Sequence, residues 1–179
     1  VCALTTLLIR TFALAADAAP ATPEQALKRV LVFYSDERLV PANVIEDEVI
    51  RRTFATDPGR PIEFYSEFLD VVRFDGETHE QRQAGFFREK YAERPPDLII
   101  SAGQAALTFL VKHRSTLFTR VPVVAHGAIE QRVLEEVSDP RIVGVPNPPR
   151  FTSTIELALA LHPHTREIAV VAGATPADR

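Results

Sequence analysis

Short apolar runs that lack polar alternation constrain the fold of this chain more than any other feature of its sequence. The first run is residues 30–34 (Val-Leu-Val-Phe-Tyr), and similar runs lie at residues 98–100, 121–125 and 168–172. Residues 62–65 and 142–145 are weaker members of the same set. A continuous apolar run of this length is typical of a central parallel strand that is covered on both faces. We therefore expect a buried parallel sheet.

The stretches between these runs carry helical patterns. Pro41 opens the first, residues 104–115 place leucines on one face, and residues 130–137 form a shorter pattern. Residues 78–81 (Thr-His-Glu-Gln) and 153–156 (Ser-Thr-Ile-Glu) have the spacing of capping boxes at helix starts. Strict alternation of strands and helices predicts an α/β fold with a doubly wound parallel sheet and right-handed crossovers.

Charge and cysteine content exclude several classes of function. The chain has 20 Lys and Arg against 24 Asp and Glu, a net charge of -4, and no basic cluster. Neither nucleic acid nor an anionic membrane surface is therefore an expected partner. The one cysteine, Cys2, leaves the body of the chain without a disulfide, a thiolate metal site or a catalytic thiol.

The first residues have the layout of an export signal. Residues 1–18 are mostly apolar and end in the small-residue sequence Ala16-Asp17-Ala18, which is typical of a cleavage site. A membrane anchor is the alternative, although the apolar stretch is shorter than the roughly 20 residues of a spanning helix. Residues 19–28 are expected to form a linker.

Open parallel sheets bind ligands beyond the carboxyl ends of their strands, near the point where the strand order reverses. Small residues at 101–103 lead directly into a predicted helix, whose N-terminus favours an anionic or polar group. Small residues that merely fit a short turn are the alternative, Tyr65 could instead fill the core, and His126 could serve ligand contact or local packing. The predicted ligand-binding residues are Ser35, Asp36, Tyr65, Ser101, Gly103, Gln104, His126, Gly127 and Asn147.

Motifs for catalysis are missing from the sequence. It contains neither G-x-G-x-x-G nor G-x-x-x-x-G-K-[ST], and Ile99 stands where a nucleophile elbow at Ser101 would need glycine. A receiver domain would need an aspartate where Ser101 stands. No histidine lies in an H-E-x-x-H motif. We therefore expect no catalytic residue, no metal site and no cofactor.

Segments along most of the chain resemble a known family. Residues 29–35 (Arg-Val-Leu-Val-Phe-Tyr-Ser), 61–70 (Pro-Ile-Glu-Phe-Tyr-Ser-Glu-Phe-Leu-Asp), 94–100 (Arg-Pro-Pro-Asp-Leu-Ile-Ile) and 154–159 (Thr-Ile-Glu-Leu-Ala-Leu) carry the resemblance. They look like the extracytoplasmic sensor domains of bacterial histidine kinases, which are similar to ABC-type substrate-binding proteins. The resemblance covers residues 28–179 and depends on the order and spacing of these segments.

This resemblance implies the first lobe of a periplasmic-binding fold of type 1, with flavodoxin-like strand order. Residues 29–149 would form that lobe, and residues 150–179 would form the crossover helix and first strand of an incomplete second lobe. The sequence departs from the family at His126-Gly127, where a smaller residue or cysteine is expected before the glycine. It departs again at residues 146–149 (Pro-Asn-Pro-Pro), a stiffer crossover than the family pattern.

The function implied is a non-catalytic sensor domain, periplasmic or otherwise extracytoplasmic, that supplies the input to a histidine kinase in a two-component system. The alternative is the substrate-binding component of an ABC transporter, and a small α/β enzyme is a third reading. The expected partners are a small polar ligand and a membrane-linked kinase or permease. Self-association, for example as a dimer, is also expected if the surface that faces a second lobe is exposed.

Overall fold

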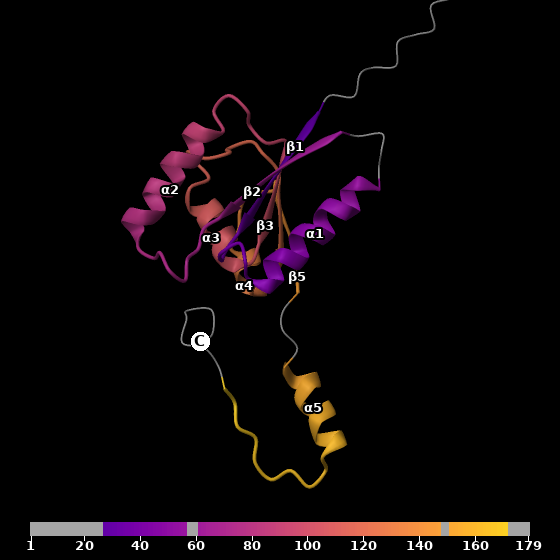
Figure 1. Ribbon diagram of the computed structural model, residues 1–179. Coiled ribbons are helices and arrows are strands. Elements are labelled where there is room, and N and C mark those ends of the chain that lie inside the picture. The colour runs from indigo at the N-terminus through magenta and orange to yellow at the C-terminus, as the bar shows by residue number, and fades with distance from the viewer. Residues whose placement is uncertain (1–26, 57–60, 148–150, 172–179) are drawn as a thin grey trace, which may run out of the picture.

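The computed structural model describes residues 27–56, 61–147 and 151–171. Strands and helices alternate strictly along these residues (Figure 1). In chain order they are β1 (Lys28–Tyr34), α1 (Pro41–Ala55), β2 (Ile62–Phe68), α2 (Glu77–Lys90), β3 (Leu98–Ala102), α3 (Gln104–Lys112), β4 (Val123–Gly127), α4 (Gln131–Glu135), β5 (Ile142–Pro146) and α5 (Phe151–Leu161). The predicted alternation is therefore present through the described chain.

The strands form one sheet in the order β2-β1-β3-β4-β5, and every neighbouring pair is parallel. This is the flavodoxin-like order of a doubly wound sheet, in which the chain winds first to one side of β1 and then to the other. The predicted fold class is confirmed.

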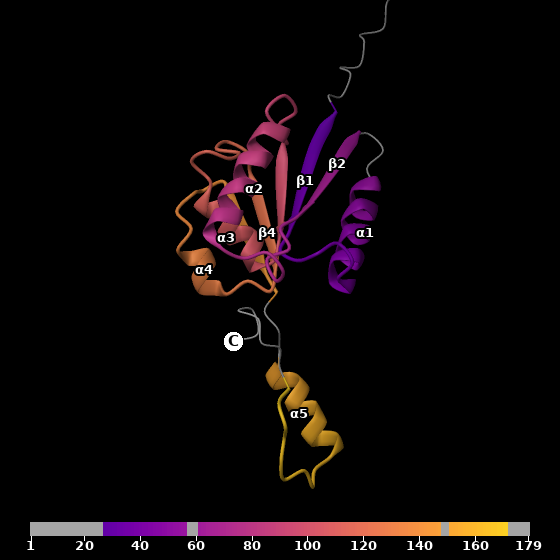
Figure 2. The same cartoon turned by 60° about the vertical axis from the view of Figure 1, so that its left-hand side comes forward.

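Helices cover the two faces of the sheet unequally. Helices α2, α3 and α4 lie on one side and α1 lies on the other (Figure 2). On the first face Leu31 and Phe33 of β1 pack with Phe87 of α2 and Phe109 of α3. On the second face the alternate residues of β1 pack with Ile50 and Phe54 of α1. Because β1 feeds both cores, residues 30–34 are at most 3% exposed, which explains why this run is apolar throughout.

Several local predictions were wrong. The Thr78 and Ser153 capping boxes do not cap helices, because α2 starts at Glu77 after Gly76 and α5 starts at Phe151. Residues 168–171 are not a strand. A strand needs a paired neighbour, and none of the described strands pairs with this segment. The predicted export signal and most of the linker lie outside the described residues.

Helix α5 does not cover the sheet. It lies beyond the carboxyl ends of the strands (Figures 1 and 2), and residues 151–171 are exposed throughout. Assignment of this segment to a second lobe stays a prediction.

We expect Leu31→Ala to lower the free energy of unfolding by about 2–5 kcal/mol, because the side chain is fully buried at the centre of the sheet. Urea denaturation followed by circular dichroism measures the change. Leu39→Ala is the matched control, because Leu39 is 74% exposed and should cost almost nothing. Equal costs for the two substitutions would contradict the assignment of the core.

Candidate functional site

The strand order places a topological switch point between β1 and β3. The chain leaves β1 for β2 on one side and returns to β3 on the other side. Strand β1 ends at Tyr34 and β3 at Ala102, so the two carboxyl ends lie side by side. Ser35, Asp36, Gly103 and Gln104 follow these ends. The structure therefore brings these predicted residues to the edge at which open parallel sheets bind ligands.

The Ser35 hydroxyl joins the ends of β1 and β3. Its Oγ donates to the Ala102 carbonyl at 3.0 Å and accepts from the Ala106 N–H, also at 3.0 Å. Ser35 therefore caps α3 from a neighbouring strand, because the N-cap position itself is Gly103, which has no side chain. This hydroxyl was predicted to contact a ligand, but both bonds that it makes are internal.

Two glycines allow three strand ends to approach one another. Gly103 has φ +88°, and a Cβ there would lie 2.8 Å from Ser35 Oγ. Gly127 has φ +98°, and a Cβ there would lie 3.3 Å from the Gly103 nitrogen. The Gly103 N–H donates to the His126 carbonyl at 2.9 Å. The lack of a side chain at both glycines therefore allows the backbones at the ends of β3 and β4 to contact each other.

Gln104 and Asn147 connect the next loops to this edge. Gln104 Oε1 accepts from the Glu130 N–H at 3.0 Å, which links the start of α3 to the loop before α4. The Asn147 N–H donates to the Gly127 carbonyl at 2.8 Å, so the residue after β5 is held beside the end of β4. The Asn147 residue is exposed.

The N-terminus of α3 keeps part of its capacity for an anionic group. Ser35 occupies the Ala106 N–H, and the Gly103 carbonyl accepts from the Leu107 N–H at 3.3 Å. The N–H groups of Gln104 and Ala105 have no acceptor within the helix, because they lie in its first turn. An anionic ligand group is therefore expected to bind only at the N–H groups of Gln104 and Ala105.

Asp36 is the charged predicted residue at the switch point. It is partly buried and forms no ion pair within the described part of the chain. Burial, followed by the negative charge of Asp70, raises the pKa of the Asp36 carboxyl above its ordinary value. A positive or hydrogen-bond-donating ligand group would relieve both effects.

Asp70 and Arg73 also lie at this edge, although neither was among the predicted ligand-binding residues. Asp70 follows β2 with φ 53°, and Arg73 Nε donates to its two oxygens at 2.9 and 2.8 Å. Arg73 also pairs with Glu37 at 3.0 Å. The prediction ended the second strand near Tyr65, although Phe68 and Leu69 continue the apolar pattern. These two apolar residues indicated a longer strand, and a longer strand would have placed Asp70 at its end.

Tyr65 and Ser101 do not reach the edge. Tyr65 lies in the middle of β2 opposite Leu31, and its ring packs against Tyr91 with centroids 5.6 Å apart. Ser101 lies inside β3 and is fully buried. The hydroxyl oxygens of both residues have no hydrogen-bond partner among the described residues. Placing them at the edge was wrong, because both strands extend beyond the residues predicted to end them, and Tyr65 takes its alternative role of packing against the core.

His126 lies on β4 between Ala102 of β3 and Val145 of β5. The residue is partly exposed, but its Nε2 is buried and has no partner in the described part of the chain. The structure therefore leaves both predicted roles open, ligand contact and local packing.

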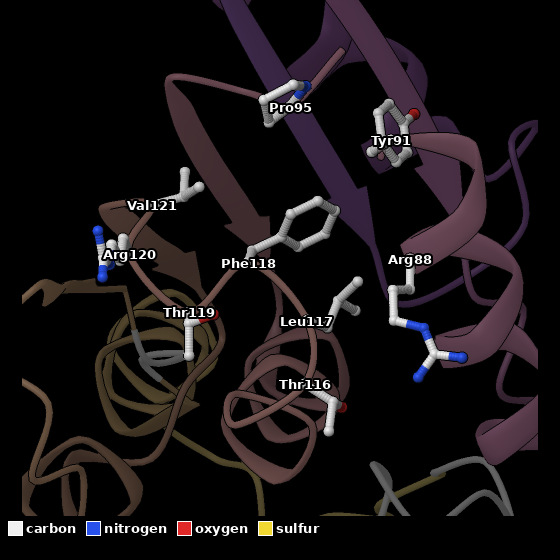
Figure 3. A pocket seen from close by; sticks show the side chains of 9 residues that line it. All are labelled: Arg88, Tyr91, Pro95, Thr116, Leu117, Phe118, Thr119, Arg120 and Val121. Atoms are coloured by element: carbon white, nitrogen blue, oxygen red, sulfur yellow. The ribbon is translucent and has the colours of Figure 1, made fainter. Parts of the chain in front are cut away.

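Two hollows are lined by none of the residues predicted to bind a ligand. The first, about 290 Å³, lies at the opposite edge, where the end of α2 meets the loop between α3 and β4 (Figure 3). Arg88 and Arg120 line it, but their side chains point apart, with Leu117 and Phe118 between them. They are therefore not arranged to hold one anion together.

The second hollow, about 370 Å³, lies between α1 and β2. At its floor Asp47 accepts from Tyr34 Oη at 3.1 Å, from Ser66 Oγ at 3.0 Å and from Arg51 Nε at 2.6 Å. Burial alone would raise the pKa of Asp47, but the bonds from Arg51 and Ser66 hold it below its usual range. The charges of this cluster are satisfied internally, so its evident role is to fasten α1 to the sheet.

Comparison with protein-family models and with curated proteins gave no match. Among the described residues, no helix has the length and apolar character needed to span a bilayer. Within the same ranges, no group of three or more His, Cys, Asp or Glu side chains is placed to hold a metal ion.

We expect the costs of Ser35→Ala and Gly103→Ala to be non-additive. Ser35→Ala removes the cap of α3 and should cost about 0.5–2 kcal/mol. Gly103→Ala introduces a Cβ against the Ser35 hydroxyl at a positive φ, and loss of that hydroxyl relieves the contact. The double variant should therefore cost less than the two single variants together, as measured by urea denaturation. Gly76→Ala, at φ 94° in open space, is the control for φ strain alone.

We expect Asp36→Asn to raise the melting temperature at pH 7. Because the pKa of Asp36 is raised on folding, its stabilising contribution is present at low pH and is lost as the pH rises through the folded-state pKa. The gain from the neutral amide should therefore fade below about pH 4, where the unfolded carboxyl is also protonated. Melting curves from pH 3 to pH 8 measure it, with exposed Asp75→Asn as control. A lower melting temperature for D36N at pH 7 would contradict the prediction.

Proposed function

We propose that residues 29–149 form the first ligand-binding lobe of an extracytoplasmic receptor, as the input domain of a sensor histidine kinase. The observation that carries this proposal is the switch point between β1 and β3, where Asp36 has no counter-ion among the described residues and lies near the first turn of α3. The sequence resemblance supplies the class of receptor.

The chemistry of this edge suits a small polar ligand. Asp36 favours a positive or donating group, and the N–H groups of Gln104 and Ala105, which have no acceptor within the helix, favour a negative or accepting group. These opposite preferences lie at neighbouring strand ends, since Ser35, which follows β1, bonds directly to the first turn of α3. A ligand that carries an amine and a carboxylate would satisfy both.

The arrangement of the hydroxyl groups argues against a serine hydrolase. Ser35 Oγ is bonded to a backbone carbonyl and a backbone N–H, and no basic side chain bonds to it. Ser101 is fully buried and could not meet a substrate. A nucleophilic serine needs both access and an adjacent base.

Signalling would follow from a shift between open and closed states. The candidate residues lie at the rim of the sheet, and neither hollow described above contains them. A second lobe that closes over this rim would bury the ligand and be stabilised by it, in proportion to the difference in ligand affinity of the two states.

A thermal-shift screen tests the ligand class. We expect small amines and amino acids to raise the melting temperature with concentration, and D36N to abolish the shift. Thr119→Ala, at the opposite edge, should retain it. Hits among carboxylates without an amine, undiminished in D36N, would place the site elsewhere.

The same geometry would serve a transporter receptor. A hydrophobic segment followed by cytoplasmic domains in the complete gene supports the sensor, whereas a stop codon soon after a complete second lobe supports the transporter component.

A further inference from the structure

Within the described ranges, no helix or loop covers one part of the sheet. On the face that packs against α1, Ile100 and Ala102 of β3 are buried, and Val124 of β4 is partly exposed. Beyond them Val143 and Val145 of β5 are each 58% exposed. These residues lie on the same face as the α1 core, because Val124 pairs with Ile100 on one side and with Val143 on the other. A parallel sheet normally has both faces covered, so this valine surface (Val124, Val143 and Val145) calls for a partner.

Helix α5 carries an apolar stripe that is exposed in the described part of the chain. Phe151, Ile155 and Leu159 recur every four residues and therefore share one face. All three are exposed, as are the flanking Leu157 and Leu161. In a doubly wound fold the helix after a strand packs onto the sheet, so α5 has the chemistry of the missing cover.

The connection between β5 and α5 disfavours packing of α5 onto its own sheet. Residues 146–149 are Pro-Asn-Pro-Pro. Each proline fixes its own φ, and the residue before a proline is driven away from the helical region, here at Val145, Asn147 and Pro148. The restrained backbone that this proline-rich sequence imposes opposes the reversal that would bring α5 back, and α5 lies beyond the edge of the sheet (Figure 1).

We propose that the valine surface is the docking site for α5 of a second copy of this chain, and that two copies exchange these helices reciprocally. The dimensions agree, because an 11-residue helix is about 16 Å long and a five-residue strand is also about 16 Å long. A two-fold axis makes both contacts at once. Phe151 is 71% exposed, Val143 and Val145 are 58% exposed, and Ile155 and Leu159 are 39% exposed, so two reciprocal contacts would bury on the order of 1,000 Å². That is about the lower bound for a specific interface. This inference does not use the edge at Asp36, but docking of α5 would cover His126, which lies beside Val145 on the same face.

Analytical ultracentrifugation of the full chain tests the exchange by complementation. We expect the chain to dimerise, and Val145→Asp and Leu159→Asp each to weaken the dimer at least tenfold. Mixing the two variants should restore a heterodimer, since its intact α5 meets its intact valine surface once. Ser153→Asp, on the polar side of α5, is the matched control and should dimerise normally. Unchanged melting curves of the sheet in L159D would show that the loss is not unfolding.

Disulfide trapping separates exchange from folding back within one chain. In a Cys2→Ser background, V145C combined with I155C should give a covalent dimer on a non-reducing gel, whereas V145C with E156C should not. A disulfide closed within one chain would overturn the proposal. So would a monomer at all concentrations up to about 100 µM, a dimer that survives L159D, or a mixture without rescue.

Discussion

Burial of β1 on both faces is the constraint on which the rest of the structure depends. Leu31 and Phe33 belong to the core beneath α2 and α3, while Val30, Val32 and Tyr34 belong to the core beneath α1. A slip of one residue would exchange these two sets, so the register of the central strand also fixes which helices lie on which face. The Tyr34 hydroxyl also helps to position α1, because it donates a hydrogen bond to Asp47 of that helix at the end of the strand.

The same strand organises the candidate site. Ser35 follows directly after β1 and caps α3, so its hydroxyl serves the fold and leaves Asp36 as the neighbouring group available to a ligand. The close approach of the strand ends disfavours the charged form of Asp36. Burial and Asp70 act on Asp36 because β1 and β2 end side by side, with no cation paired to Asp36 among the described residues. The carboxylate form of Asp36 is therefore disfavoured by its surroundings in the described part of the chain.

The uneven distribution of helices is a second consequence of the winding. Three helices cover one face and α1 covers part of the other, which leaves the β4–β5 portion open. Gly144 suits the covered side, because a Cβ there would overlap the side chain of Leu134 of α4. Val143 and Val145 lie on the opposite side of the same strand and are exposed among the described residues. Strand β5 is therefore covered by α4 on one face and exposed on the other.

The sequence by itself determined the alternation of elements, the parallel sheet and the edge at which Ser35, Asp36, Gly103 and Gln104 meet. These features follow from local signals, namely apolar runs, helical spacing and the residues just after them. Only the tertiary structure decided where each strand stops, because strand length depends on pairing with a neighbour. Pairing with β1 extends β2 to Phe68, so Asp70 lies at the edge of the sheet. The same pairing places Tyr65 and Ser101 inside their strands, away from that edge. It also left residues 168–171 outside the sheet, because an apolar run without a neighbouring strand has nothing to bond to.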